Sequence, residues 1–437
     1  MALVLKFLEA FAVDLLDAAA IVTFLFAGLV CLAVLERKVM RSSISEPARE
    51  NEDLPELLQR LSFSFKSYAR GLLTENPGRF LPWLASILSA ACGIVAFAAL
   101  TFAPGVRLAD VDAGLIFILG ASFLGIYVGV LARGFSAKAD SLAGLARNAM
   151  RVTSLEGASA LALLSGVILA GSISIKQIVE AQLDQGAWFV FLAPLGFVLY
   201  LASSIAGIEI AAKPFTRASS SQEAGAPAGT GSFRWPFDSL RASIHLLVGA
   251  GLATTVFWGG WLRPFASYHD HFAGTSVELL DVLPPLVMAI ACVYFYRLAT
   301  TEEDSARKQL TKIAGEICVA LFVVFTGVLF APVVALEVVH GAFWFLAKMM
   351  AYVYLFLWLR GRIPQYRFGR PIRAAWNFLI PLSAINLACV AAALVTRERW
   401  DWSPALSTFL MTTIALGIAG WLGLKDAGEA ERYSLEP

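Results

Sequence analysis

The sequence predicts an all-α polytopic membrane protein, and three observations support this fold class. Hydrophobic residues make up 58% of the 437 residues and charged residues only 15%, whereas a soluble domain is about half apolar and about a quarter charged. Apolar stretches long enough to cross a bilayer recur along the whole chain. Basic residues gather in every second loop between these stretches, as they do in multi-pass proteins.

The expected elements are transmembrane helices, because a helix crosses the hydrocarbon core with about 20 apolar residues. They form a single membrane domain over residues 1–437, and no internal repeat is visible to indicate an inverted-repeat transporter. Eleven stretches meet the length: 14–35, 80–103, 113–133, 155–174, 187–209, 240–261, 279–299, 313–337, 341–360, 376–396 and 404–424.

The loop charges predict the orientation of these helices. Alternate loops and the C-terminal tail hold 27 of the Lys and Arg residues, while the N-terminus and the opposite loops hold 6. This bias places the N-terminus outside and the C-terminus in the cytoplasm. The Ser-, Ala-, Gly- and Pro-rich segment 214–231 is then a cytoplasmic loop. The net charge of +1 gives no reason to expect a nucleic-acid partner.

Ionisable residues within spans need a reason, because a charge there costs about 2.5–3.5 kcal/mol on insertion scales. Asp14, Asp17 and Glu337 lie near the outer ends of their spans, and Glu316 follows Lys312 by four residues and can pair with it. The three that remain without such an explanation are Glu156, Glu209 and Lys348. A carboxyl group inside the protein can take up and release protons, which suits a proton path. Lys348 lies mid-span, so we expect it to have an acidic partner or to face water.

No cofactor or metal site is expected in this chain. The five cysteines all lie in apolar stretches, and neither a CxxC pair nor a GxGxxG turn between a strand and a helix is present.

Several segments resemble one family, the H subunit of respiratory complex I, the NADH:quinone oxidoreductase. They cover about half of the chain in the order of the family: VLERKVM (34–40), FKSYARGLLTENPGRF (65–80), FLGIYVGVLARGFSAKADSLAGLARNAMRVTSLEGASALALL (123–164), TTVFWGGW (254–261) and FWFLAKMMAYVYLFLWLRGRIPQYRFGRPIRAAWNFLIPLSAINL (343–387).

The resemblance implies a function and a set of site residues. Members of this family join the redox arm to the membrane arm, line the quinone chamber and contain a row of buried acids that couples quinone chemistry to proton pumping. The positions that match the proton path are Glu156, Glu209, Glu223 and Lys348. Those that match the quinone chamber or the docking face for the redox arm are Glu36, Arg37, Lys38, Arg147 and Arg367.

The sequence also departs from the family pattern. The segment that begins at Pro214 replaces the acidic, quinone-facing loop of the family, and Thr, Ser and Ala stand at polar or acidic positions: Ala211, Ala212, Thr216, Ser219, Ser221 and Ala242. Three helices exceed the eight that are usual in the family. Two of them form an inserted transmembrane hairpin over 279–337, and the third is an extra C-terminal helix at 404–424.

We therefore expect a non-autonomous subunit of a proton-translocating NADH:quinone oxidoreductase in the bacterial cytoplasmic (inner) membrane. Its partners would be other membrane subunits, iron–sulfur subunits and lipid, with quinone bound at the interface with the redox subunits. Three alternatives stay open: a scaffold subunit with a disused quinone site, the membrane anchor of a related hydrogenase and, with less support, a stand-alone transporter.

Overall fold

The computed structural model describes residues 17–29, 31–32, 35, 80–104, 112–134, 142–221, 235–264, 279–301, 333–362 and 375–400, with isolated positions between 312 and 327 and at 414 and 417. The regular elements within these ranges are helices. Each of the longer helices has a high content of apolar residues, in accordance with the predicted class.

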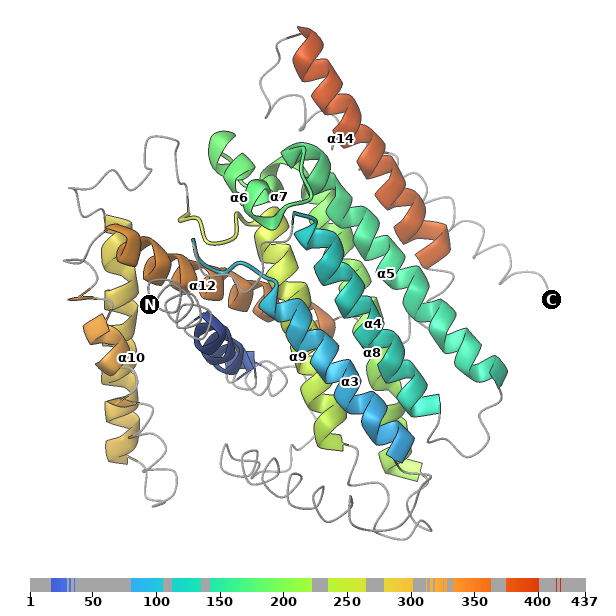
Figure 1. Cartoon of the computed structure of the whole chain (residues 1–437), viewed down its shortest axis with the longest axis horizontal. Coiled ribbons are helices and arrows are strands. Elements are labelled where there is room, and N and C mark those ends of the chain that lie inside the picture. The colour runs from blue at the N-terminus through green and yellow to red at the C-terminus, as the bar shows by residue number, and fades with distance from the viewer. Residues whose placement is uncertain are drawn as a thin grey trace, which may run out of the picture.

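Five long helices run side by side and form the central bundle (Figure 1). Their bounds are Phe80–Ala98 for α3, Gly114–Gly134 for α4, Leu142–Ala170 for α5, Pro194–Ser221 for α8 and Trp235–Phe257 for α9. Helix α3 packs against both α4 and α9, and α5 packs against α8.

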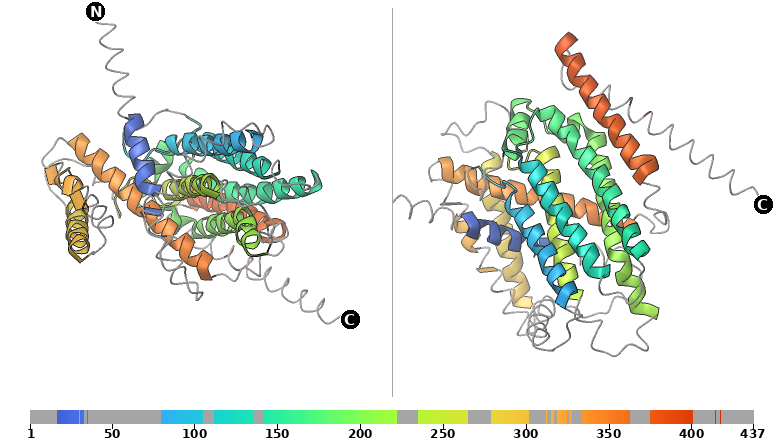
Figure 2. Two further views of the ribbon diagram at one scale, coloured as in Figure 1. Left: turned by 90° about the horizontal axis from the view of Figure 1, so that it is seen from below. Right: turned by 45° about the vertical axis from the view of Figure 1, so that its right-hand side comes forward.

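Four further helices surround this bundle. Helix α12 (Val333–Arg362) crosses it at a steep angle and packs against α9, while α14 (Ile380–Trp400) lies along α5 at one edge (Figures 1 and 2). Helix α10 (Leu279–Thr301) stands at the opposite edge (Figure 1). The helix Asp17–Leu29 joins the core through Phe24, whose ring stacks on Phe102 at a centroid distance of 4.4 Å.

Glycine allows the helices of the bundle to approach closely. A Cβ atom at Gly166 of α5 would overlap the Cγ1 atom of Val256 on α9, and a Cβ atom at Gly251 of α9 would overlap Leu100. Small residues have this role in membrane bundles, where helices associate through close packing rather than through the hydrophobic effect.

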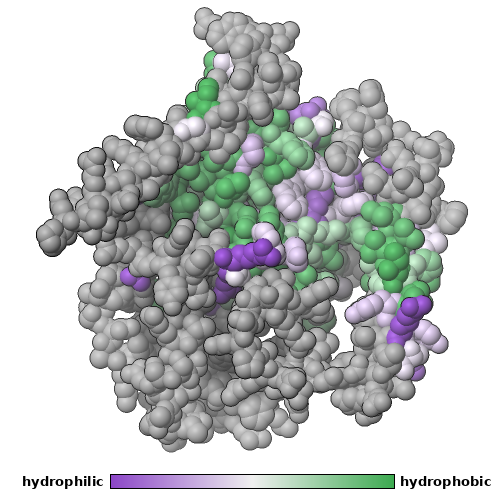
Figure 3. All heavy atoms as spheres, turned by 180° about the vertical axis from the view of Figure 1, so that it is seen from behind, coloured by the Kyte–Doolittle hydropathy of each residue, from purple (hydrophilic) through white to green (hydrophobic). Residues whose placement is uncertain are grey.

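Three of the helices are long and apolar enough to cross a membrane by length and composition: Ala149–Ala170, Glu337–Arg362 and Trp376–Thr396. Large apolar side chains are also exposed on the bundle surface, among them Phe26, Phe191, Ile290 and Val395. Apolar side chains cover much of the described face in Figure 3. These features are those of a membrane protein, because an exposed apolar surface is stable in contact with lipid chains and not in contact with water.

The helix ends differ from the predicted spans in several places, because hydropathy reports the membrane core and not the extent of a helix. Helix α5 begins at Leu142, well before the expected start at 155. Helix α12 begins at Val333, so residues 333–337 belong to it and not to the expected 313–337 helix. Helix α8 continues to Ser221, so the first part of segment 214–231, expected to be a loop, is helical.

The predicted span 187–209 is two helices. Phe189–Leu192 forms the short α7, Ala193 leaves helical geometry with φ −131° and ψ 59°, and Pro194 opens α8. Proline suits the first position of a helix, where its missing N–H has no acceptor to lose.

A short helix that was not predicted, α6 (Ile175–Asp184), lies in the loop after α5. Its buried residues are spaced along one face: Ile175, Ile178, Val179, Gln182 and Leu183. This spacing is that of an amphipathic helix too short for a span, and it covers the end of the bundle.

Candidate functional site

Glu156 lies in the membrane-spanning part of α5 and is partly buried. The hydroxyl group of Ser159, one turn later, donates to the backbone oxygen of Glu156 at 2.8 Å and lies 3.4 Å from its Oε2. Ser159 thus provides a polar contact for the carboxyl group within an otherwise apolar helix. A carboxyl group in such a position can act as a proton acceptor and donor inside the bundle.

Two tyrosines from different helices, Tyr200 and Tyr352, are buried close to each other in the interior. Tyr200 of α8 interacts electrostatically with both Glu156 and Tyr352 of α12. The Tyr200 hydroxyl donates to the backbone oxygen of Gly249 on α9 at 2.8 Å, and the rings of the two tyrosines lie 6.2 Å apart. The hydroxyl group of Tyr352 is buried, and the side chain of Ser204 on α8 interacts with both phenol groups. The two tyrosines therefore bring α8, α9 and α12 together.

Lys348 lies one turn before Tyr352 on α12 and is 6% exposed. Its ammonium group donates hydrogen bonds to the backbone oxygens of Trp258 at 2.8 Å, Gly260 at 2.9 Å and Leu262 at 2.5 Å. It also lies 4.7 Å from the ring centroid of Trp188. These acceptors belong to the turn that follows α9, so the lysine ties α12 to the end of α9.

The contacts of Lys348 correct an expectation from the sequence. Neither a carboxylate nor water was needed to explain this buried charge, because three carbonyl dipoles and an aromatic face receive it. The C-terminal end of a helix has a partial negative charge and unpaired carbonyl groups, and both favour a cation there.

The turn itself requires glycine. Gly259 and Gly260 have φ values of 71° and 51°, in the left-handed region that side chains disfavour. A Cβ atom at Gly259 would also lie 2.8 Å from the ring of Trp188. The left-handed turn at these two glycines therefore allows the carbonyl groups of Trp258, Gly260 and Leu262 to face Lys348.

Gln182 of α6 satisfies a further carbonyl at the end of α9. Its Nε2 atom donates to the backbone oxygen of Thr255 at 2.9 Å, and its Oε1 atom accepts from the backbone N–H of Phe189 at 3.1 Å. One buried amide thus joins the end of α9 to the start of α7. At an exposed helix end, water donates hydrogen bonds to the last carbonyl groups; here Gln182 of α6 and Lys348 of α12 donate them instead.

A second polar cluster lies between α3, α4 and α9. The Nδ1 atom of His245 lies 3.4 Å from the Ser122 hydroxyl, and Ser89 donates to the backbone oxygen of Gly125. One turn before His245, Arg241 is 4% exposed and packs against Gly129. This cluster holds three helices together away from Glu156.

The comparison with protein families gives a match over residues 16–391, most of the chain, to the family described as NADH dehydrogenase. The chain belongs to this family. It is 31% identical to the NADH-quinone oxidoreductase H subunit 2 of Solibacter usitatus, over 76% of this chain and 83% of that protein. It is 29% identical to the corresponding H subunit 1 of Koribacter versatilis, over 78% of this chain and 82% of that protein.

A third relative of this NADH dehydrogenase family member matches a larger share of the chain. It is the NADH-quinone oxidoreductase H subunit of Dehalococcoides mccartyi, 24% identical over 92% of this chain and 90% of that protein. The resemblance found in the sequence is thus confirmed as membership of the family.

The structure describes only some of the residues that the resemblance selects. Glu156 and Lys348 are described in full, whereas Glu209 and Arg147 have described backbones only, on α8 and α5. Five others lie outside the described residues: Glu36, Arg37, Lys38, Glu223 and Arg367. Within the part of the chain that is described, no group of three or more His, Cys, Asp and Glu side chains has a geometry suited to a metal ion.

Sequence reasoning missed Tyr200, Tyr352 and Gln182. The two phenols resemble ordinary aromatic residues of apolar helices, and Gln182 lies in a loop where no helix was expected. One signal was present for Tyr352. It follows Lys348 by four residues, so the two share one helix face.

Proposed function

We propose that this chain is the H subunit of a proton-translocating NADH:quinone oxidoreductase and anchors a redox arm at a modified quinone chamber. The names of its relatives support the assembly, since each is a subunit of an NADH-quinone oxidoreductase. Quinone would bind at the interface with the redox subunits, and the chain itself would hold no cofactor. In this proposal the chain crosses the bacterial inner membrane with eleven helices, with its N-terminus outside.

We also propose that the chain couples electron transfer to proton movement through Glu156, with Glu209 and Lys348 further along the path. The observation that supports this is the position of Glu156 within the bundle, beside Ser159 and electrostatically linked to Tyr200. Several family acids are Ser, Thr or Ala here, so water must bridge the remaining groups.

The substitution Glu156→Gln tests the coupling, because it removes the titratable proton while keeping the shape of the side chain. In the intact complex reconstituted into proteoliposomes, we expect electron transfer from NADH to quinone to continue and proton translocation to stop. The matched control is Glu180→Gln on α6, where the carboxylate is half-exposed and pairs with Lys176 at 3.4 Å. Full translocation in Glu156→Gln would disprove the coupling.

The scaffold alternative also has a specific observation in its favour. Lys348 is fully occupied with the carbonyl oxygens that end α9, so a structural role is enough to explain this buried charge. A scaffold subunit would retain the redox arm and electron transfer in every variant and would show no effect of Glu156→Gln on translocation. Purification with iron–sulfur partners distinguishes both functions from that of a transporter, which would be isolated alone.

A further inference from the structure

We infer that Arg151 of α5 and Glu209 of α8 form an ion pair across the interface of these two helices, and that Arg151 thereby balances the charge of Glu209 on the proton path. The inference rests on the proposed proton coupling, which places Glu209 on that path. Arg151 is a residue that the family resemblance does not select.

The first observation is the register of α5 and α8, which pack against each other. A Cβ atom at Gly196 of α8 would overlap the Oγ atom of Ser165 on α5. Ten residues later on α8, Ala206 packs against Leu155, which lies ten residues earlier on α5. The two helices are therefore antiparallel and keep one register over this length.

The second observation is the position of the two charged residues in this register. Arg151 lies four residues before Leu155, and Glu209 lies three residues after Ala206. At about 1.5 Å per residue, both lie about 4.5–6 Å beyond the contact between Leu155 and Ala206, in the same direction along the bundle. Residues three or four apart share a helix face, so each charged residue occupies the face of its helix that packs on the other helix.

The third observation is the environment of the Arg151 side chain. This side chain is partly buried within the apolar span Ala149–Ala170, and its Nε atom is buried without a hydrogen-bond partner among the described residues. A guanidinium group keeps its charge in proteins. A charge in such a place is costly unless an opposite charge pairs with it, so Arg151 requires an acidic partner.

Glu209 is the acid whose position fits this requirement. Glu156 lies five residues after Arg151, which turns it by about 140° around α5, and the Ser159 hydroxyl lies beside its carboxyl group. The π-helical turn η4 (Ala375–Leu379) also packs against α5 and α8 and contains no acidic residue. Among the elements that the structure describes at this level, α8 therefore supplies the opposite charge.

The pair defines what Arg151 contributes to the proton path. When the carboxyl group of Glu209 gives up a proton, its O–H bond breaks and a carboxylate remains. The guanidinium group opposite balances this negative charge and can hold the carboxylate by two parallel hydrogen bonds. Arg151 stays charged throughout, so it positions Glu209 and does not carry the proton itself.

The first test is a double-mutant cycle on the thermal midpoint of the intact complex, with Arg151→Gln, Glu209→Gln and the variant that combines them. Each single variant leaves one charge in the helix interface without its counter-charge, whereas the double variant leaves none. We expect both single variants to lower the midpoint and the double variant to regain more than half of the larger loss. The control cycle uses Lys176→Gln and Glu180→Gln, a half-exposed pair at 3.4 Å, whose removal should barely change the midpoint.

The second test is the number of protons translocated per electron in proteoliposomes, which a purely structural ion pair would not alter in an assembled complex. We expect Arg151→Gln to lower this ratio by more than half. Arg151→Lys retains the positive charge and should retain most of the ratio. NADH oxidation by a soluble acceptor checks that the redox arm is intact in each variant.

The outcomes separate this inference from the proposed function. The midpoint cycle needs no proton measurement, so a double variant that is no more stable than the weaker single variant overturns the inference alone. A normal ratio in Arg151→Gln, together with a loss in Glu156→Gln, also overturns it and leaves the proposed coupling intact. Normal ratios in both variants overturn both. If Arg151→Gln does not assemble, assembly of the double variant supports the pair, and its failure to assemble overturns the inference.

Discussion

The ammonium group of Lys348 donates a hydrogen bond to the backbone oxygen of Gly260 at 2.9 Å and thereby joins two helices that are far apart in the sequence. Helix α9 ends at Phe257 and the chain turns through Gly259 and Gly260. Lysine from α12 supplies the donors that this turn lacks. Helix α12 crosses the bundle at a steep angle (Figure 1), and Lys348, about halfway along this helix, anchors it to the end of α9.

The first prediction concerns this anchor. Lys348→Met keeps the length of the side chain but leaves the backbone oxygens of Trp258, Gly260 and Leu262 without their donor. We expect a loss of about 2–4 kcal/mol in stability, since each unsatisfied buried group costs about 1–3 kcal/mol and the turn can relax in part. The measurement is the thermal midpoint of the purified complex in detergent.

Lys176→Met is the control for that measurement. Lys176 forms a half-exposed ion pair with Glu180 on α6, and such a pair contributes about 0–1 kcal/mol. Equal midpoints for the two methionine variants would show that the Lys348 contacts do not stabilise the fold.

The second prediction concerns helix packing at Gly166. An alanine at this position would drive its Cβ atom into the Cγ1 atom of Val256 and close to the backbone oxygen of that residue at 3.4 Å. Valine has few rotamers, so α5 and α9 must separate at a cost of about 1–3 kcal/mol. A lower thermal midpoint and a lower yield of folded chain are the expected results.

Gly157→Ala is the matched control on the same helix. A Cβ atom at Gly157 would meet nothing within 4 Å, so only the higher helix propensity of alanine acts there, worth up to about 1 kcal/mol. We expect this variant to be neutral or slightly more stable. If Gly166→Ala were equally stable, the close approach of α5 and α9 would not be a feature of the folded protein.

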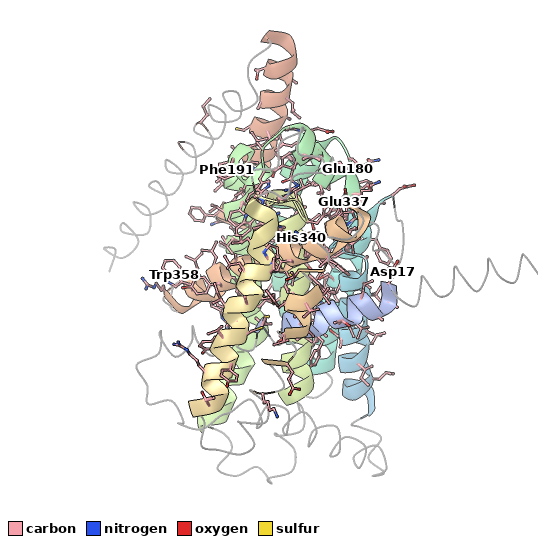
Figure 4. The ribbon with its side chains drawn as sticks, turned by 90° about the vertical axis from the view of Figure 1, so that its left-hand side faces the viewer. Asp17, Glu180, Phe191, Glu337, His340 and Trp358 are labelled. Atoms are coloured by element: carbon pink, nitrogen blue, oxygen red, sulfur yellow. The ribbon has the colours of Figure 1, made fainter. Side chains whose placement is uncertain are left out.

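The third prediction concerns orientation in the membrane. Glu180 on α6 and Glu337 on α12 lie toward the same end of the bundle, and Trp358 lies toward the other end of α12 (Figure 4). The loop charges predict that the end with α6 is outside. A cysteine in place of the half-exposed Glu180 should then react with a membrane-impermeant thiol reagent in intact cells.

The variant Ala146→Cys tests the other side of the membrane. Ala146 is exposed near the start of α5, on the side that the loop charges place in the cytoplasm. This variant should react only in inverted vesicles, with the unsubstituted chain as the background for its native cysteines. Reaction of Ala146→Cys in intact cells, with Glu180→Cys protected, would reverse the orientation.

The helix positions show why some boundaries could be predicted and others could not. The predicted 113–133 span agrees closely with α4, because its apolar stretch and its helix end together. The predicted 376–396 span begins with a π-helical turn, η4 (Ala375–Leu379), before α14. Pro381 explains that turn, because proline lacks an N–H and its ring collides with the carbonyl group four residues earlier.

Some residues of the candidate site could likewise be predicted from the sequence, and others could not. Glu156 and Lys348 were found in the sequence because a charged residue in an apolar stretch is conspicuous. Tyr200 and Tyr352 were missed because tyrosine is common in such a stretch. The role of a buried tyrosine depends on the residues that pack against it. Only the packing of α8 and α12 on α9 brings these two phenols together and joins Tyr200 to the backbone of α9.

The sequence by itself determined the membrane class and the family, while the tertiary structure decided the partners of the buried polar groups. A membrane span is a local property, because the bilayer requires about 20 consecutive apolar residues whatever the rest of the chain does. The partners of Lys348 are non-local. They are backbone oxygens, which every residue has, and only the turn at Gly259 and Gly260 and the crossing of α12 direct three of them to one ammonium group.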